Sequence, residues 1–229
     1  MRLIDEEYTR HPFFGTRRML VYLRGLGHEV NRKRVQGLYE LMGLEAVYPK
    51  PNLSQKNIEH RIYPYLLRGI KVERVNQVWS TDITYIRLKQ GFVYLMAIID
   101  WFSRYVLDWQ ISTTLEAEFC TEALSRVLNE ALCEIFNTDQ GCQFTAKNFV
   151  DQLLERKIQV SMDGKGRALD NIFVERLWRS VKYECVYLRD FQTVAEAKEH
   201  IRIYFDFYNN ERPHQSLGYR TPKDLYFSS

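Results

Sequence analysis

The stretch WSTDITYI, residues 79–86, decides the fold because it has the pattern of a β-strand and yet carries an aspartate in its middle. Asp82 shares one face of that strand with Ser80, Thr84 and Ile86. Aspartate is depleted in strands, and a buried carboxylate costs free energy unless it is paired or binds a metal. We therefore expect Asp82 to be a functional carboxylate. The alternative is a solvent-facing position on an edge strand.

Two more strands follow at once. Residues 92–99 form the longest apolar run, which is apolar on both faces and therefore predicts a strand in the interior of a sheet. The turn Lys89-Gln90-Gly91 joins it to the first strand as a hairpin. A third strand is expected at residues 104–111.

Helices and strands then alternate. The expected elements are a helix at 115–132, a strand at 134–138, a helix at 146–156, a strand at 158–161, a Gly-rich loop at 163–167, and helices at 170–184 and 193–209. Three antiparallel strands followed by this alternation indicate an α/β fold. The layout matches a ribonuclease-H-like fold, a mixed five-stranded sheet with helices on both faces.

The N-terminal segment has a different, all-α pattern. Residues 15–24 form one expected helix, and a second begins after Asn31, a good N-cap, and ends at Gly43. Its apolar positions at helical spacing are Val35, Leu38, Leu41 and Met42. Residues 49–61 are polar with two prolines and read as linker. We expect a helix-turn-helix-like segment at 1–48, a linker at 49–68 and a catalytic domain at 69–229.

Arg32, Lys33 and Arg34 fill the first turn of the second helix, where the helix dipole disfavours cations. A helix end that contacts DNA phosphates, as in helix-turn-helix units, would explain them. The alternative is a solvated basic turn that costs a few tenths of a kcal/mol, roughly, in stability.

Composition limits the class of protein. Hydrophobic residues make up 45% of the 229 residues, enough for a packed core. Residues 1–78 hold 14 Lys and Arg against 8 Asp and Glu, and residues 79–229 hold 18 against 21. This asymmetry fits a nucleic-acid-binding segment ahead of a catalytic domain, or chance. No stretch is long enough to span a membrane, and the four cysteines form no CxxC pair or zinc pattern, so free thiols in a reducing cytoplasm are expected.

Two more carboxylates are candidates. Asp139 ends the short strand EIFNTD, and the carboxyl ends of strands are where open α/β sheets bind ligands; the alternative is a turn-forming aspartate before glycine. Glu175 lies on a helix face with Asn171, Arg179 and Lys182, which could hold a metal at one end and follow DNA phosphate at the other. The alternative is a surface pair of Glu175 with Arg179.

The remaining acids have structural interpretations. We expect Asp170 to cap the helix that carries Glu175. Asp100 ends the interior strand and is expected to be structural, with Ser103 and Arg104 forming the turn. Asp108 and Asp163 are expected at the surface.

Several stretches together resemble one family. They are WSTDITYI (79–86), VYLMAIIDWFSRYVLDW (93–109), NTDQGCQFT (137–145), DNIFVERLWRSVKYE (170–184) and FYNNERPHQSLGYRTP (207–222). They resemble the integrase catalytic core, of the retroviral-integrase superfamily, in bacterial insertion-sequence transposases of family three, specifically the product of the second reading frame (OrfB type). The stretch HPFFGTRRMLVYLRGLGHEVNRKRV (11–35) resembles the helix-turn-helix region ahead of that core.

The resemblance implies a set of roles. The 35 residues between Asp139 and Glu175 match the spacing of the family's acidic triad, whose first member is Asp82. The triad would bind two Mg²⁺ ions, for which Mn²⁺ can substitute, and would be catalytic. Lys182 and Arg179 are expected on the DNA, and Gln143 near it.

The implied activity is DNA cleavage and strand transfer: hydrolysis at a 3′ transposon end, then attack of the freed 3′-OH on another phosphodiester. Implied partners are transposon-end and target DNA, further copies of the chain, and the upstream-frame product as a fusion or separate partner; the expected compartment is the bacterial cytoplasm, at the nucleoid. Two alternatives stay open. One is a ribonuclease-H-type nuclease, and the other is a non-catalytic DNA-binding regulator of transposition.

Overall fold

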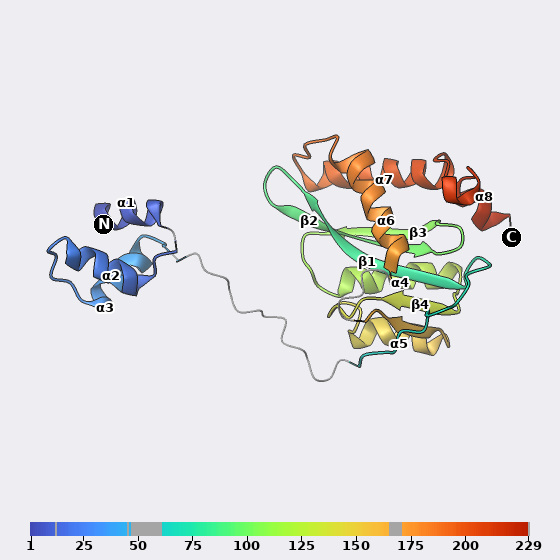
Figure 1. Ribbon diagram of the computed structural model, residues 1–229, viewed down its shortest axis with the longest axis horizontal. Helices are drawn as coiled ribbons and strands as arrows, with labels where there is room; N and C mark the ends of the chain where they lie inside the picture. The colour runs from blue at the N-terminus through green and yellow to red at the C-terminus, as the bar shows by residue number, and fades with distance from the viewer. Residues whose placement is uncertain (12, 45, 47–60, 165–170, 229) are drawn as a thin grey trace. The chain divides into compact units, whose positions relative to one another are not determined.

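The computed structural model describes residues 1–11, 13–44, 46, 61–164 and 171–228. The chain forms two compact units, Met1–Gln55 and Lys56–Ser229 (Figure 1). Most of the expected linker, the end of the Gly-rich loop and the expected helix cap Asp170 lie outside the described residues. None of the described helices is long and apolar enough to cross a membrane.

The first unit is a small bundle of helices. α1 spans Arg2–Arg10, α2 spans Thr16–Gly25 and α3 spans Arg32–Leu41. The two predicted helices, α2 and α3, are confirmed, whereas α1 was not predicted. Its apolar residues Leu3, Ile4 and Tyr8 do lie at helical spacing and pack together in the core, so the sequence held a signal for α1 that was missed. The buried side chains that join the three helices are Ile4, Met19, Leu23, Val35 and Tyr39.

The ends of α3 follow the sequence prediction. The Asn31 side chain accepts a hydrogen bond from the Arg34 amide at 2.8 Å, and Gly43 has φ 63°, which suits glycine at a helix end. The prediction was wrong for one of the apolar positions of this helix, because Leu41 is 72% exposed. Tyr39 is buried instead and donates its hydroxyl to the Phe14 carbonyl at 2.9 Å.

The second unit is built on a mixed five-stranded sheet in the order β3-β2-β1-β4-β5. The strands are β1 (Val78–Arg87), β2 (Phe92–Asp100), β3 (Val106–Ser112), β4 (Ile135–Thr138) and β5 (Gln159–Met162). β1, β2 and β3 are antiparallel neighbours, whereas β4 pairs parallel with β1 and with β5. The predicted sheet is confirmed, and β1 rather than β2 is its middle strand.

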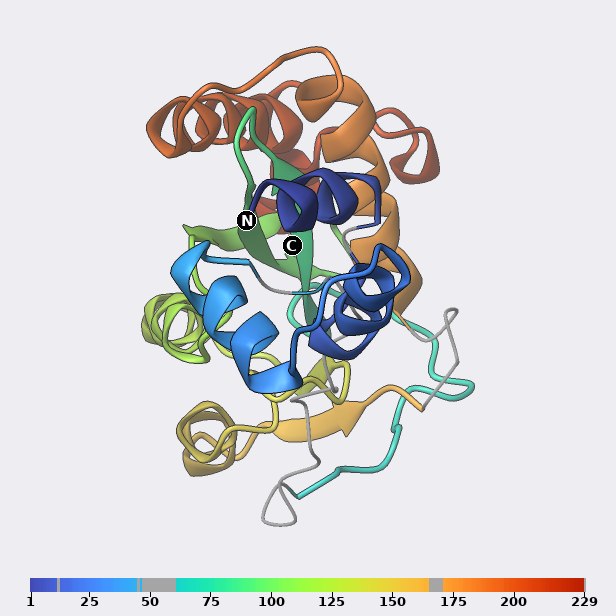
Figure 2. The same ribbon diagram turned by 90° about the vertical axis from the view of Figure 1, so that its left-hand side faces the viewer.

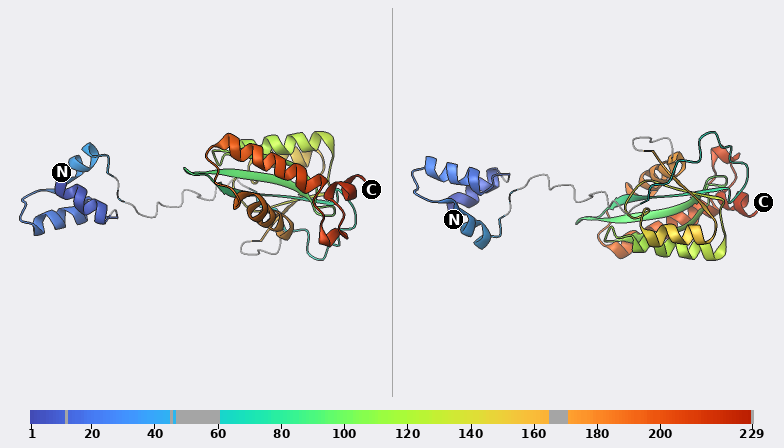
Figure 3. Two further views of the ribbon diagram at one scale, coloured as in Figure 1. Left: turned by 90° about the horizontal axis from the view of Figure 1, so that it is seen from above. Right: turned by 90° about the horizontal axis from the view of Figure 1, so that it is seen from below.

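Helices cover both faces of the sheet. They are α4 (Glu118–Glu130), α5 (Lys147–Glu155), α6 (Ile172–Val181), a π-helical turn (Lys182–Val186), α7 (Val194–Asn210), a 3₁₀ turn (Gln215–Leu217) and α8 (Pro222–Phe227). Figures 2 and 3 show α4 and α5 on one side of the sheet and α6 on the other. Each face therefore has its own core.

The core on the α6 side joins Ile86 and Leu95 of the sheet to Val174, Leu177 and Phe205 of α6 and α7. The core on the opposite side packs α4 and α5 against Trp79, Met96 and Phe136, among other residues. Because side chains alternate along a strand, the face of β1 with Ile86 is also the face of Asp82. Asp82 therefore lies on the α6 side.

The end of α7 and the segment after it, which was not predicted to be helical, make long-range contacts with earlier parts of the unit. Asn209 pairs with the edge strand β3 through its side-chain amide, donating to the Val106 carbonyl and accepting from the Val106 amide, each at 2.9 Å. The Tyr226 hydroxyl of α8 donates to the Asn76 side chain at 2.9 Å. The Asn209 bonds hold the end of α7 against β3, and the Tyr226 bond holds α8 beside the start of β1.

Candidate active site

Asp82 lies in the middle of β1, between β2 and β4, so the edge-strand interpretation is excluded. Its carboxylate is half-buried, and its Oδ2 accepts a hydrogen bond from the Trp178 indole of α6 at 2.9 Å. Burial raises the pKa of Asp82 to about 6, although hydrogen bonds from Ile83 and Trp178 lower it. The negative charges of Asp139 and Glu175 raise it further.

Asp139 reaches the same region from the neighbouring strand. β4 runs parallel to β1 with Asn137 opposite Ser80, so Asp139 and Asp82 each lie two residues beyond a paired position. Asp139 is exposed at the end of the strand. Its carboxyl group is nevertheless partly desolvated by the protein around it, which raises the pKa of Asp139 above its usual value. The Gly141 amide donates to its Oδ1 at 2.9 Å. The strand-end prediction for Asp139 is thus confirmed as to position.

Gly141 has a steric reason to be glycine. A Cβ atom there would lie 2.9 Å from Asp139 Oδ1 and 3.2 Å from Gln143 Oε1. Such a contact forces the carboxylate to move. The loop after β4 therefore wraps its backbone closely around the Asp139 side chain.

Glu175 comes from the first turn of α6, on its exposed side. Asn171, at the N-cap of α6, is buried and donates its side-chain amide to the Thr81 carbonyl at 3.2 Å. That bond fixes the start of α6 beside the residue that precedes Asp82. An acid in the first turn is also stabilised by the helix dipole.

The three carboxylates are close enough for Asp82 to feel both of the others. Among the residues that the structure describes, no three His, Cys, Asp or Glu side chains are grouped tightly enough to hold a metal ion as they stand. The charged groups that shift the pKa of Asp82 are both acids, so negative charge is concentrated around it. Such a concentration of carboxylates attracts divalent cations that prefer oxygen ligands.

Protein-family models match most of the chain. An integrase core domain model matches residues 72–168, a second integrase core domain model matches residues 156–222, and an HTH-like domain model matches residues 1–52. The transposase for insertion sequence element IS904 of Lactococcus lactis is 32% identical over 93% of this chain and 87% of its own length. The chain belongs to the insertion-sequence transposases.

Other relatives agree. The putative transposase InsK for IS150 of Escherichia coli is 30% identical over 91% of this chain and 76% of its own length, and the transposase for IS629 of Shigella sonnei is 28% identical over 100% and 78%. The fold also matches solved structures. A simian T-cell lymphotropic virus intasome in complex with PP2A regulatory subunit B56 gamma has a TM-score of 0.61 at 14% identity, covering 88% of this chain and 69% of that one. The catalytic core domain of BIV integrase has a TM-score of 0.53 at 19% identity, covering 67% and 95%.

The transposase is therefore an enzyme, a polynucleotidyl transferase of the Asp-Asp-Glu type with a retroviral-integrase fold. Its HTH-like and integrase core domains imply binding to DNA. The integrase core family generally depends on divalent metal ions.

The basic residues of the transposase predicted to contact DNA lie at distinct places. Arg179 is exposed on α6, and Lys182 is half-buried where α6 changes into a π-helical turn, with its carbonyl accepting the Tyr187 amide at 2.8 Å. Turns of this kind are frequent at functional sites. The first turn of α3, in the first unit, carries Arg32, Lys33 and Arg34. All three side chains are exposed and therefore accessible to a ligand.

Gln143 of the transposase has a different environment from the one expected of a DNA contact. Its side chain is only 6% exposed and donates to the Leu115 carbonyl at 2.8 Å. Its amide oxygen faces the Gly141 position. Gln143 therefore ties the loop that carries Asp139 to the segment before α4.

Sequence reasoning missed three residues that position the carboxylates of the transposase: Trp178, Gly141 and Asn171. In the sequence, Trp178 resembles any other apolar residue of α6, and Gly141 resembles an ordinary turn glycine. Asn171 was expected on the helix face of Glu175, but it is the N-cap residue, buried and bonded to β1, whereas Glu175 is exposed. A polar side chain at the start of an amphipathic helix that packs on a sheet was the available signal.

Three further acids of the transposase, Asp100, Asp108 and Asp163, have hydrogen-bond or ion-pair partners within the fold. Asp100 is fully buried and structural, as predicted, and accepts hydrogen bonds from the Ser103 amide and hydroxyl and from the Asn76 amide. Asp108, expected at the surface, is half-buried and ion-paired with Arg126 at 2.8 Å. Asp163 is half-buried and accepts from the Asn137 side chain at 2.8 Å.

Proposed function

We propose that Asp82, Asp139 and Glu175 are the catalytic carboxylates of this transposase and that they hold two Mg²⁺ ions, for which Mn²⁺ can substitute. The observation that carries the proposal is the state of Asp82. It is a half-buried acid in the middle strand of the sheet whose pKa is raised to about 6 by burial and by the other two carboxylates. Two-metal phosphoryl transfer needs such a set of acids on rigid elements.

The donors fit magnesium. All three side chains offer oxygen ligands, which Mg²⁺ prefers, and they come from a strand, a strand end and a helix. When bound, the ions supply activation of the attacking oxygen and stabilisation of the leaving oxygen. The HTLV-2 integrase catalytic core domain, solved in complex with magnesium, has a TM-score of 0.50 at 17% identity, covers 68% of this chain and 98% of its own, and supports this choice by analogy of fold.

The chain's own groups orient the acids. The Trp178 indole donates to Oδ2 of Asp82 and so fixes the orientation of the carboxylate. The Gly141 amide holds Asp139 in a similar way. Asn171 fixes the start of α6 to β1 and so determines how far Glu175 can approach. Positioning of this kind is a large part of catalysis because displacement by about 1 Å can cost about 10²-fold in rate.

The reaction we propose has two steps. A water oxygen attacks the phosphorus at the transposon end, and the bond to the flanking strand breaks to leave a free 3′-OH on the transposon. That 3′-OH then attacks a phosphodiester of target DNA, and one strand of the target leaves from the phosphorus. The chain takes no covalent part, so the protein contributes position and charge.

Recognition of DNA would be shared between the units. We assign residues 1–48 to a helix-turn-helix-like domain that meets phosphates through Arg32, Lys33 and Arg34, residues 49–68 to a linker, and residues 69–229 to the catalytic domain. Arg179 and Lys182, farther along the helix of Glu175, would follow the DNA end.

Gln143 would lie near the nucleic acid because it belongs to the loop that carries Asp139, which it ties to the Leu115 carbonyl. We further propose that several copies assemble on transposon ends and target DNA in the bacterial cytoplasm, at the nucleoid, and that an upstream-frame product acts as a fusion or separate partner. The simian T-cell lymphotropic virus intasome supports assembly on DNA by analogy of fold.

A cleavage and joining assay tests the proposal. The purified chain, with Mg²⁺ and a DNA duplex that carries the terminal inverted repeat of its element, is expected to nick the end and join it to target DNA. Asp82→Asn and Glu175→Gln should abolish both products, whereas Glu199→Gln, an exposed acid on α7, should leave both unchanged. Unchanged activity of Asp82→Asn and Glu175→Gln would refute the assignment.

A further inference from the structure

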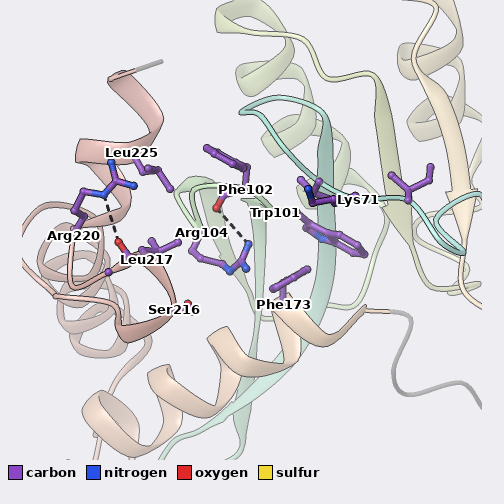
Figure 4. Close-up of a pocket in the computed structure, with 12 residues that line it drawn as sticks. Lys71, Trp101, Phe102, Arg104, Phe173, Ser216, Leu217, Arg220 and Leu225 are labelled. Atoms are coloured by element: carbon purple, nitrogen blue, oxygen red, sulfur yellow. Dashed lines mark hydrogen bonds between the residues drawn. The ribbon is translucent and has the colours of Figure 1, made fainter.

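A pocket outside the carboxylate site lies on the other side of α6. It has a volume of about 650 Å³, within the range of small-molecule sites. We call it the Arg104 pocket and define it by the six lining residues that matter here: Lys71, Trp101, Phe102, Arg104, Phe173 and Arg220. Figure 4 shows that they come from the segment before β1, the β2–β3 turn, the start of α6 and the C-terminal segment.

The pocket is cationic. Three of its lining residues are Lys or Arg, and none of the described lining residues is Asp or Glu. Lys71 is ion-paired with Glu73 at 2.7 Å, whereas the Arg220 side chain donates to the Leu217 carbonyl at 3.4 Å and forms no ion pair with a described acid. The positive charge available to an anion is therefore that of Arg104 and Arg220.

Arg104 is the strongest of the three cations as a ligand. Its guanidinium makes no ion pair with a described acid and has one long hydrogen bond of 3.5 Å, to the Phe102 carbonyl. The nearby carboxylate of Asp100 is occupied by Ser103 and Asn76. Burial lowers the pKa of Arg104 to about 10, so the group stays charged at neutral pH at the cost of desolvation.

The backbone of Arg104 is also unusual. Its φ is 65°, in the left-handed region that favours glycine or asparagine. A side chain there costs of order 1 kcal/mol, and strained residues of this kind cluster at functional sites. The guanidinium lies over the Phe173 ring, whose centroid is 3.7 Å from Arg104 Cζ (Figure 4).

Aromatic walls make the pocket suited to a nucleotide rather than to a bare anion. Trp101 and Phe173 pack edge to face at 4.8 Å between centroids, and Phe102 is half-exposed at the pocket. Cationic grooves with aromatic side chains bind single strands by pairing phosphates and stacking bases. An acidic peptide would use the charges and would leave the aromatic faces without a matching partner.

The position of the pocket connects it to DNA. Phe173 and Glu175 are two residues apart on α6 and so point to different sides of the helix. A helix is about 10 Å wide, and a strand rises about 3.4 Å per nucleotide, so a strand that crosses the start of α6 reaches the pocket within a few nucleotides.

We propose that the Arg104 pocket binds one nucleotide of a DNA strand near the reacting phosphodiester, with its phosphate on Arg104 and its base against Phe102, since the Phe173 ring is already covered by Arg104 and Trp101. The proposal rests on the proposed function, because it places the reacting phosphodiester at Glu175. The pocket is a binding site and takes no part in bond making or breaking.

Equilibrium binding in EDTA tests the proposal without any strand being cut. The full chain is titrated onto a fluorescent duplex that carries the terminal inverted repeat and a short single-stranded extension at its end, at several salt concentrations. Arg104→Gln is expected to raise Kd about 10-fold and to reduce the slope of log K against log salt by about 0.7, the loss of one contact to a single-strand phosphate. Arg104→Lys should keep the slope and raise Kd less.

Arg202→Gln is the matched control, because Arg202 is exposed on α7 and pairs with Glu199 and Asp206. It should change neither quantity, and melting curves of all variants show whether they fold. An Arg104→Gln variant that folds and binds like Arg202→Gln would overturn the proposal. So would an effect of Arg104→Gln on self-association of the free protein alone, which would mark the pocket as a protein interface.

Photo-crosslinking gives a second readout that a folding defect cannot imitate. DNA with 5-iodouracil at successive positions near the end is expected to crosslink to Phe102 in the wild-type chain. Crosslinks confined to other parts of the chain would overturn the proposal. Crosslinking at the pocket is also measured in Asp82→Asn, so a failure of the catalytic assignment and a failure of the pocket remain distinguishable.

Discussion

Asp82 and Asp100 lie on neighbouring strands of one sheet and share a residue type, yet their surroundings differ. Asp100 is the last residue of β2 and pairs with Trp79, whereas Asp82 lies in the middle of β1 and pairs with Ala97. Burial raises the pKa of both carboxyls. Burial alone therefore does not distinguish a structural acid from a functional one.

The hydrogen-bond donors make the distinction. Asp100 accepts from the Ser103 amide and hydroxyl and from the Asn76 amide, all within 2.8 Å, so the protein satisfies both of its oxygens. Asp82 has the Trp178 indole as its side-chain donor and is repelled by Asp139 and Glu175. A buried acid whose neighbours are other acids is unfavourable until a cation binds, and this contrast with Asp100 supports the proposal that Asp82 is a metal ligand.

The largest expected effect separates activity from stability at Asp82. Asp82→Asn should lower the rate of end cleavage by about 10³-fold or more, because a metal ligand is lost, and should leave the melting temperature equal or higher, because charge repulsion is relieved. The Trp178 hydrogen bond can be kept by the asparagine oxygen. Single-turnover cleavage and thermal melting measure the two quantities. A variant that melts far below the wild type would show that Asp82 supports the fold.

The opposite pattern is expected at Asp100. Asp100→Asn should lower the free energy of unfolding by about 3 kcal/mol, because its new amide group faces donors that then lack an acceptor. Denaturant unfolding measures this loss, and cleavage per folded molecule should stay within a few-fold of the wild type. Ser103→Ala, which removes only one hydroxyl donor, should cost about 1 kcal/mol. Equal stability of Asp100→Asn and the wild type would remove the basis of the comparison.

Gly141 tests positioning without charge. Gly141→Ala places a methyl group against Asp139, which should rotate away and slow cleavage by about 10-fold or more, with little change in melting temperature. Gly37→Ala is the control, since its Cβ would meet no atom within 4 Å and the residue lies in a helix. Its cleavage rate should equal that of the wild type. Wild-type cleavage by Gly141→Ala would mean that the Asp139 orientation is unimportant.

The smallest expected effect is in the pH dependence of stability without metal. Asp82 has a folded pKa of about 6, above its unfolded value, so the folded state holds more protons and stability falls as pH rises from about 4 to 6. Relative to Asp82→Asn, the wild type should lose about 1–2 kcal/mol over this range after allowance for partial exposure. Denaturant midpoints of both proteins in EDTA give the difference. A difference that is constant with pH contradicts the raised pKa.

Much of the catalytic unit could be predicted because its signals are local. The bounds of β1 follow from alternation around Asp82, and the interior position of β2 follows from its unbroken apolar run. The strand end at Asp139 follows from an acid and a glycine after apolar residues. The helix of Glu175 follows from the stripe of Val174, Leu177 and Val181.

The rest depends on contacts between distant residues. The helix α8 is six residues long and begins with a local capping box of Thr221 and Asp224, but its position in the fold depends on Tyr226 reaching Asn76, 150 positions away. The burial of Gln143 depends on its hydrogen bond to the Leu115 carbonyl. The π-helical turn at Lys182 interrupts a sequence pattern that predicts a continuous helix. Trp178 is paired with Asp82 across 96 positions, so no local pattern could give it a role.

Manganese binding to the matched aspartate variants tests the central claim most directly, because it needs neither DNA nor turnover. Mn²⁺ is titrated into the metal-free wild type, Asp82→Asn and Asp100→Asn, and bound metal is followed by electron paramagnetic resonance. Binding should be present in the wild type and in folded Asp100→Asn and strongly weakened in Asp82→Asn. Equal binding by the wild type and Asp82→Asn would contradict the assignment of Asp82 as a metal ligand.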